Sequence, residues 1–305
     1  MPSDQPSPPS QTGAVVDYLD ERDAEADRYW RGLLTGETSL APTSRVARAV
    51  FRHLPSAPRC KWCYAPYGAP FGPLLGRLGY GRWDKNPSLC QVCMTYMEKH
   101  QGGAEVDLAV MFADLRGSTQ MAATMSPAAY SRLLNVFYGI AGDAIQGVGG
   151  IVDKYLGDGV LALFLPGYTD QGPATIAVTA ASRILERVSA EAELPLEGRP
   201  LPVGIGVHYG QAYVGIVGQA GHPTDFTALG DAVNVAERVS SAAAAGELMV
   251  SDAAARELGR PLEGAERREL TLRGVDAPVP AWSVKPAERP SAAARSASPS
   301  DEDED

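Results

Sequence analysis

Short apolar runs alternate with amphipathic segments of helical period between residues 105 and 285. The first run, Val106–Phe112, has the length and the continuous apolar character of a buried strand. A helix is predicted from about Ser126, with Pro127 in its first turn, because apolar residues recur on one face as far as Ile140. Strands that alternate with helices in this way predict an α/β fold (an α+β sandwich), in which helices pack on a sheet.

Two pairs of short apolar runs in this region predict β-hairpins. The first pair flanks Gly157-Asp158-Gly159, and the second flanks Tyr209-Gly210, so each has a glycine-containing turn. Further elements follow the same periodicities. Helices are predicted over residues 174–190 and from about residue 231, and strands over residues 248–250, 269–273 and 281–284.

The composition of the chain divides it into five segments. Residues 1–14 are rich in Pro, Ser and Gln, and residues 286–305 end in five acidic residues, so both are predicted to be disordered. Residues 15–57 show helical periodicity, whereas residues 58–100 contain every cysteine and lack a long periodic segment. We therefore predict a helical segment, a small cysteine module and one larger domain over residues 105–285.

Charge and hydropathy exclude several classes of protein. The formal net charge of −10 argues against general binding to nucleic acid or to anionic membranes. No apolar run approaches the ~20 residues that span a bilayer. The first residues have neither the basic nor the apolar region of a secretory signal, so we expect a cytoplasmic protein without a membrane partner.

The four cysteines form two C-x-x-C pairs, Cys60 with Cys63 and Cys90 with Cys93, separated by 26 residues. In a reducing compartment such pairs indicate metal binding rather than disulfides. Two pairs of thiolates suit tetrahedral Zn²⁺, and an iron–sulfur cluster is the alternative. Aromatic and basic residues interleave in the same segment, a mixture that can stack on single-stranded nucleic acid but more often forms the core of a small metal module.

Two aspartates stand where strands end. Asp114 follows the first apolar strand and precedes a glycine-containing loop, whose N–H groups can cradle phosphate. Asp158 lies in the turn of the first predicted hairpin. If these strands are neighbours, both carboxylates meet at one edge of the sheet, which is what Mg²⁺ bound to a polyphosphate requires.

Four sequence motifs resemble those of class III adenylyl and guanylyl cyclases. They are FADLRGST (112–119), VDKYLGD (152–158), HYGQAYVGIVG (208–218) and DFTALGDAVNVAER (225–238). The likeness covers about residues 105–285, with the motifs in the family's order and at compatible spacing. It implies the ferredoxin-like catalytic fold of this family, preceded here by a small helical and metal-ribbon module.

The resemblance also implies the metal ligands and the base-reading residues. Asp114 and Asp158 match the two metal aspartates, and the Leu115 carbonyl is a further ligand for two Mg²⁺ or Mn²⁺ ions per active site. Lys154 and Thr227 match the residues that read the purine. A lysine donor suits adenine N1, and a threonine hydroxyl can accept from the 6-amino group, so ATP is favoured over GTP.

The resemblance further assigns the residues around the reacting phosphate. Asn234 and Arg238 match the transition-state pair, and their spacing of four places them on one helical face. Arg273 matches a late basic residue that contacts the terminal phosphates. In this family the metal aspartates come from one subunit and the base-reading and transition-state residues from the other, so a homodimer with two equivalent sites is implied.

We therefore expect an adenylate cyclase that converts ATP into 3′,5′-cyclic AMP and pyrophosphate. Cyclisation of GTP or of a pyrimidine nucleotide is an alternative, because only two residues select the base. Another alternative is a catalytically silent, nucleotide-sensing domain. A third is a zinc module that binds nucleic acid and carries the second domain as an attachment.

Overall fold

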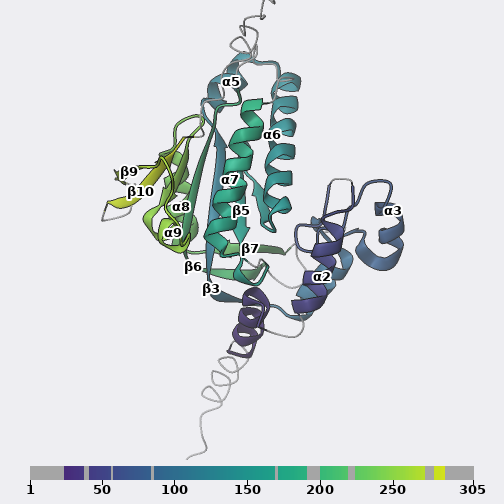
Figure 1. The fold of residues 1–305 in the computed structure, drawn as a ribbon. Coiled ribbons are helices and arrows are strands. Elements are labelled where there is room, and N and C mark those ends of the chain that lie inside the picture. The colour runs from purple at the N-terminus through teal and green to yellow at the C-terminus, as the bar shows by residue number, and fades with distance from the viewer. Residues whose placement is uncertain are drawn as a thin grey trace, which may run out of the picture.

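The computed structural model describes residues 24–37, 41–55, 58–83, 86–168, 171–190, 200–218, 224–271 and 278–285 (Figure 1). The two segments predicted to be disordered, residues 1–14 and 286–305, lie outside the described residues, and so does Arg273. Within the described residues, no helix combines the length and the apolar character needed to cross a membrane.

An eight-stranded sheet forms the centre of the protein. Its strand order is β4-β5-β3-β6-β8-β10-β9, and β7 pairs with β6 outside this path. Only β6 and β8 pair in parallel among these neighbours. The strands are β3 (Gly103–Leu115), β4 (Ile151–Tyr155), β5 (Gly159–Phe164), β6 (Val203–Val217), β7 (Asp225–Leu229), β8 (Leu248–Ser251), β9 (Glu266–Leu270) and β10 (Val279–Val284). The predicted mixed fold of strands and helices is confirmed.

One predicted hairpin is wrong. Tyr209-Gly210 is not a turn, because β6 continues through it as one strand of 15 residues. Both residues pair with β3, Tyr209 opposite Ala109 and Gly210 opposite Leu108. The hairpin partner of β6 is instead β7, which pairs with residues 213–217. Strands β3 and β6 therefore pair over residues 103–115 and 203–215 and form the long centre of the sheet.

Helices α6 (Pro127–Gly147), α7 (Pro173–Ala190) and α9 (Asp252–Glu257) cover one face of the sheet. Alternate residues of β3, from Ala109 to Leu115, point into this layer, as the two-residue period of a strand requires. Figure 1 shows α6 and α7 side by side along this face. The Ser126 side chain accepts a hydrogen bond from the Ala129 N–H and so caps α6. The predicted helix start at Ser126 is confirmed.

The opposite face of the sheet is covered by α8 (Asp231–Ser241) and by the N-terminal segment. The intervening residues of β3, such as Leu108 and Val110, share a buried cluster with Trp30, Trp62 and Phe226. The segment contains a helix over residues 24–35, α2 (Ala41–Phe51), α3 (Gly72–Leu75), a π-helical turn (Gly76–Tyr80), β1 (Arg82–Trp83), β2 (Asn86–Cys90) and α4 (Gln91–Lys99). Residues 58–100 are thus regular in part, and they share one core with the sheet.

Helix α8 lies directly on the sheet because β6 contains a glycine beneath it. A Cβ atom at Gly206 would lie 2.1 Å from the Ser240 backbone nitrogen, so a larger side chain would displace the helix. Arg116 adds a second link, since its guanidinium donates to the Ser240 carbonyl. These contacts fix the height of α8 above the end of β3.

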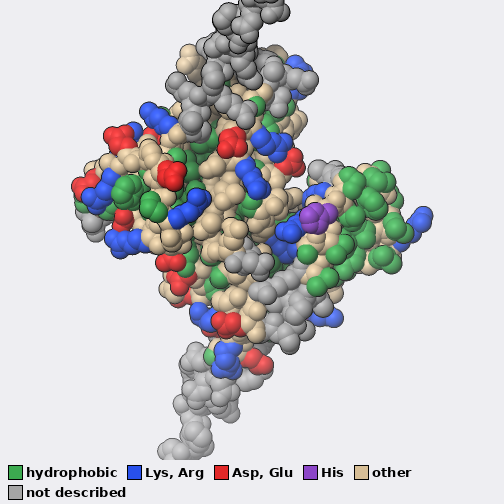
Figure 2. All heavy atoms as spheres, viewed as in Figure 1, with side chains coloured by type: hydrophobic (Ala, Val, Ile, Leu, Met, Phe, Trp, Pro, Cys, Tyr) green, Lys and Arg blue, Asp and Glu red, His purple; other side chains and the backbone are tan. Residues whose placement is uncertain are grey.

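The outer surface of the N-terminal segment is apolar around α3. Leu74 and Leu78 are 58% and 65% exposed. Figure 2 shows hydrophobic side chains gathered over this part of the molecule, with charged side chains spread over the rest of the visible face.

His208 on β6 predicts a loss of stability in mild acid. Burial lowers the pKa of His208 to about 4 from 6.5, and its Nδ1 lies 2.9 Å from Ser251 Oγ. Between these pH values the unfolded chain binds a proton here that the native protein does not, so the free energy of unfolding falls as the pH drops. The expected loss between pH 7 and pH 5 is about 2 kcal/mol.

Urea denaturation at these two pH values measures this effect. The His208→Gln variant should lose less stability than the wild type over the same interval, because glutamine does not titrate. An equal loss in both proteins would assign the pH dependence to other groups.

Candidate functional site

Two predicted metal ligands meet at one edge of the sheet. Asp114 is the penultimate residue of β3 and pairs with Gly159 of β5. The Leu115 N–H donates to the Asp158 carbonyl over 3.1 Å, so the β4–β5 turn lies against the end of β3. Strands β3 and β5 are neighbours in the sheet, which is the condition under which the two aspartates were expected to meet. Asp114, Leu115 and Asp158 therefore form one acidic edge.

The charges at the acidic edge favour a bound cation. Burial raises the pKa of Asp114, the nearby Asp158 carboxylate raises it further, and Arg116 opposes the change. Arg116 Nη1 lies 3.2 Å from Asp114 Oδ2. Because two neighbouring carboxylates repel one another, a divalent ion held between them is stabilised electrostatically. The donor set therefore fits Mg²⁺ or Mn²⁺.

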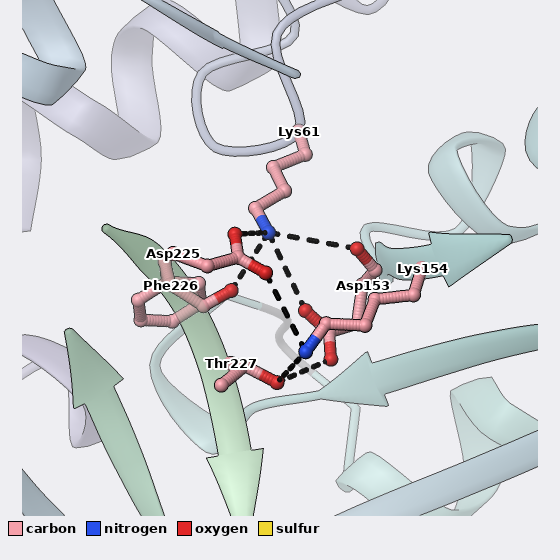
Figure 3. Close-up of polar contacts among 6 residues, drawn as sticks. All are labelled: Lys61, Asp153, Lys154, Asp225, Phe226 and Thr227. Atoms are coloured by element: carbon pink, nitrogen blue, oxygen red, sulfur yellow. Dashed lines mark hydrogen bonds and ion pairs between the residues drawn. The ribbon is translucent and has the colours of Figure 1, made fainter. Parts of the chain in front are cut away.

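The two predicted base-reading residues are in direct contact. Lys154 Nζ donates to Thr227 Oγ1 over 3.1 Å (Figure 3). Lys154 is on β4 and Thr227 on β7, and three strands separate β4 from β7 in the sheet order. The sheet must therefore curl strongly for these side chains to meet. Thr227 is 3% exposed, whereas the Lys154 side chain is 39% exposed.

Three charged residues around this pair were not predicted from the sequence. The Thr227 hydroxyl donates to Asp153 Oδ2 over 2.6 Å, and Asp225 Oδ2 lies 3.5 Å from Lys154 Nζ. Lys61 Nζ, which comes from the first C-x-x-C pair, lies 2.6 Å from Asp225 Oδ1. The sequence contains one signal for this cluster, because the charged residue Asp153 directly follows the apolar residues Ile151 and Val152 in β4.

A register shift in β4 helps Asp153 and Lys154 to reach the same partner. Consecutive residues of a regular strand point to opposite faces. The pairing of β4 with β5 shifts between Val152 and Lys154, so Lys154 is opposite Leu161. A bulge of this kind redirects side chains, which is consistent with the contacts of both residues to Thr227.

Helix α8 carries the two predicted transition-state residues. Asn234 is exposed and Arg238 is half-buried, one turn apart on the helix. The helix begins after Gly230, whose φ of 133° favours glycine and turns the chain sharply from β7 into α8. The turn at Gly230 therefore connects β7, which carries Thr227, directly to the helix that carries Asn234 and Arg238.

The four cysteines form a compact buried cluster. Their Sγ atoms all lie within 4.8 Å of one another, and those of Cys63 and Cys90 are 3.7 Å apart. Four sulfurs around a zinc ion with bonds of about 2.3 Å would be separated by about 3.8 Å. Backbone N–H groups of Cys90 and Cys93 donate to the Cys60 and Cys90 sulfurs over 3.3 and 3.4 Å. The cluster therefore fits a tetrahedral metal ion.

A tight turn brings Cys60 and Cys63, the first pair of this cluster, close together. The Tyr64 N–H donates to the Cys60 carbonyl over 3.0 Å, and Tyr64 has a φ of 66°. Burial opposes ionisation of Cys60, but hydrogen bonds with the other cysteines hold the pKa of its thiol well below the ordinary value. Hydrogen bonds with Cys60 raise the pKa of Cys93 well above it.

Comparison with known proteins identifies residues 101–284 with one family model, described as the adenylate and guanylate cyclase catalytic domain. The adenylate cyclase of Anabaena cylindrica is 32% identical over 186 residues, which are 58% of this chain and 36% of that protein. An uncharacterized protein of Mycobacterium tuberculosis is 35% identical over 184 residues, 58% of this chain and 32% of that protein. The chain thus spans about a third of the length of these curated relatives.

Two solved structures are similar to the same part of the chain. The guanylyl cyclase Cya2 is 28% identical with a TM-score of 0.55, covering 60% of this chain and 93% of that structure. The adenylyl cyclase CyaB from P. aeruginosa is 25% identical with a TM-score of 0.54, covering 61% of this chain and 97% of that structure.

Proposed function

Because this chain belongs to the family of adenylate and guanylate cyclase catalytic domains, we propose that it converts ATP into 3′,5′-cyclic AMP and pyrophosphate. The observation that carries the proposal is the acidic edge, where Asp114 and Asp158 lie on adjoining strand ends beside Leu115. These residues would hold two divalent ions, which when bound lower the pKa of an attacking 3′-hydroxyl and neutralise the leaving oxygens.

The contacts of Lys154 and Thr227 support adenine as the base. The Lys154 ammonium can only donate, which matches the acceptor at adenine N1 and opposes the N1–H of guanine. Thr227 already gives its proton to Asp153, so its oxygen is available as an acceptor. The 6-amino group of adenine can donate to that oxygen, either together with Lys154 or in place of the hydrogen bond from Lys154.

Asn234 and Arg238 would act on the ribose and the α-phosphate. The amide of Asn234 can orient the sugar by hydrogen bonds, and the guanidinium of Arg238 can stabilise the charge that develops on the phosphate oxygens. We infer that these residues serve the metal site of a second copy, in a homodimer with two equivalent sites. The exposed position of Asn234 on α8 is compatible with contact across such an interface.

We infer that the four-cysteine cluster binds Zn²⁺ as a structural ion. The supporting observations are four buried sulfurs that lie within 4.8 Å of one another and two N–H donors to them. The cluster lies in the core shared by the N-terminal segment and the sheet, so the ion would stabilise the face that carries the base-reading strand. An iron–sulfur cluster has the same thiolate requirement and remains the alternative.

A substrate panel tests the proposed activity. The purified protein should form cyclic AMP from ATP with Mg²⁺ or Mn²⁺ and should cyclise GTP, CTP and UTP more slowly. Products are separated chromatographically and quantified. Preferential conversion of GTP would favour the guanylate alternative, for which the similarity to Cya2 is the supporting observation. Binding of nucleotides without any cyclic product would favour the sensing alternative.

A further inference from the structure

Lys61 joins the cysteine cluster to the base-reading strands. Its side chain is 5% exposed although it lies between two cysteines in the sequence. Its Nζ is 2.6 Å from Asp225 Oδ1 and 3.4 Å from Asp153 Oδ1, and it donates to the Phe226 carbonyl over 2.7 Å. The Lys61 N–H donates to the Ser88 carbonyl over 2.9 Å, which fixes the base of the side chain. A buried ammonium with acceptors on Asp153, Asp225 and Phe226 is held in one position.

Figure 3 shows that Lys61 enters between β4 and β7 from the cysteine segment. The strands meet only through side chains here, because β5, β3 and β6 separate them in the sheet. Lys61 contacts an aspartate from each strand, Asp153 of β4 and Asp225 of β7. Trp62, the next residue, packs edge-on against Phe226 with ring centroids 4.6 Å apart. The first C-x-x-C pair therefore positions two strands relative to one another.

The same contacts determine which way the Thr227 hydroxyl points. Asp153 Oδ2 accepts the hydroxyl proton, and the second oxygen of this carboxylate faces Lys61. The Asp153 side chain is fully buried. Burial raises the pKa of Asp153, and the Lys61 charge is the largest influence that opposes this rise. With the ammonium in place, Asp153 stays an acceptor and Thr227 presents only its lone pairs to a ligand.

We propose that Lys61 is a positioning residue through which the four-cysteine module sets the base preference of the active site. The inference rests on the proposed cyclase function and deepens it. An accepting Thr227 oxygen suits the 6-amino group of adenine and repels the 6-oxo group of guanine. A neutral donor in place of the Asp153 carboxylate would release the hydroxyl proton toward the base, and guanine would then be tolerated.

The double variant Lys61→Met/Asp153→Asn tests this relay in the full-length protein. It replaces the buried Lys61–Asp153 ion pair by a neutral pair, and Asp225 keeps Lys154 as a charged partner. The fold is therefore preserved better than by removing one charge alone. Equilibrium dialysis with Mg²⁺ measures the dissociation constants of 3′-deoxy-ATP and 3′-deoxy-GTP, which lack the attacking hydroxyl and cannot cyclise. We expect the wild type to prefer the adenine analogue and the double variant to lose about tenfold or more of this preference.

The matched control is Lys99→Met, an exposed lysine at the end of α4 in the same module. It should leave the ratio of the two dissociation constants and the metal content of the cysteine cluster unchanged. A folded double variant with the wild-type ratio would overturn the role of Lys61, and so would an equal loss of affinity for both analogues. A wild type that neither binds these analogues nor cyclises ATP would overturn the proposed function itself, and the inference with it.

Discussion

Replacing Asp158 with alanine should lower the rate of cyclic AMP formation by about 10³-fold or more, because divalent ions stabilise such transition states by several kcal/mol. The fold should survive, since Asp158 lies in a turn at the end of β4. Steady-state assays with ATP and saturating metal measure the loss, and the unfolding midpoint reports the fold. The control is Asp143→Ala, an exposed acid on α6 paired with Arg187.

A mixing experiment separates a shared site from a site within one chain. The Asp158→Ala and Arg238→Ala variants should each be inactive alone, since each damages a different half of the constellation. Co-expressed heterodimers would contain one intact site of two, so a random mixture should recover about a quarter of the wild-type activity. No recovery in verified heterodimers would contradict a site built from two protomers, and full activity of Asp158→Ala alone would reject its role as a ligand.

Removal of the metal from the cysteine cluster should lower the unfolding midpoint by about 10 °C or more. A structural zinc ion stabilises small modules by several kcal/mol, and each kcal/mol shifts the midpoint of a domain this large by roughly 2–4 °C. The variant Cys60→Ser/Cys63→Ser should also lose one bound zinc per chain. Metal analysis and thermal denaturation measure the two effects.

The exposed residue Val92 provides the control for this experiment. It lies between Cys90 and Cys93, and Val92→Ala should retain both the metal and the midpoint. Iron and sulfide in a brown protein would identify the cluster as iron–sulfur. A wild type purified without metal, and with the same midpoint as the double cysteine variant, would contradict a structural ion.

Local periodicity was sufficient to predict much of the fold. The apolar run of β3, the capped start of α6 and the β4–β5 hairpin all depend on residues close in sequence. Periodicity failed at β6, where Tyr209-Gly210 has the composition of a turn but pairs with Leu108 and Ala109. Whether such a dipeptide is a turn or part of a strand depends on the length of the partner strand. That length cannot be read from the sequence of the segment itself. Short helices such as α5 (Ser118–Thr124) also lack enough turns to show a period.

The candidate site could be predicted only where it consists of sequence motifs. Asp114, Asp158, Lys154 and Thr227 stand in such motifs, and the structure brings each pair together. The partners of Lys61 could not be predicted, because its contacts to Asp153 and Asp225 join positions 92 and 164 residues apart. A lysine between two cysteines ordinarily belongs to a solvated turn. The burial of Lys61 results from long-range packing and therefore becomes visible only in the folded structure.

The shared core has a consequence for where the catalytic unit begins. Family likeness starts at residue 101, yet Trp30 and Trp62 pack on Phe226, which is completely buried on β7. A fragment cut at that boundary would keep every motif and would leave an apolar flank of the sheet facing water, a surface prone to self-association. The folded unit that carries the cyclase motifs is therefore longer than residues 101–284, which match the family model.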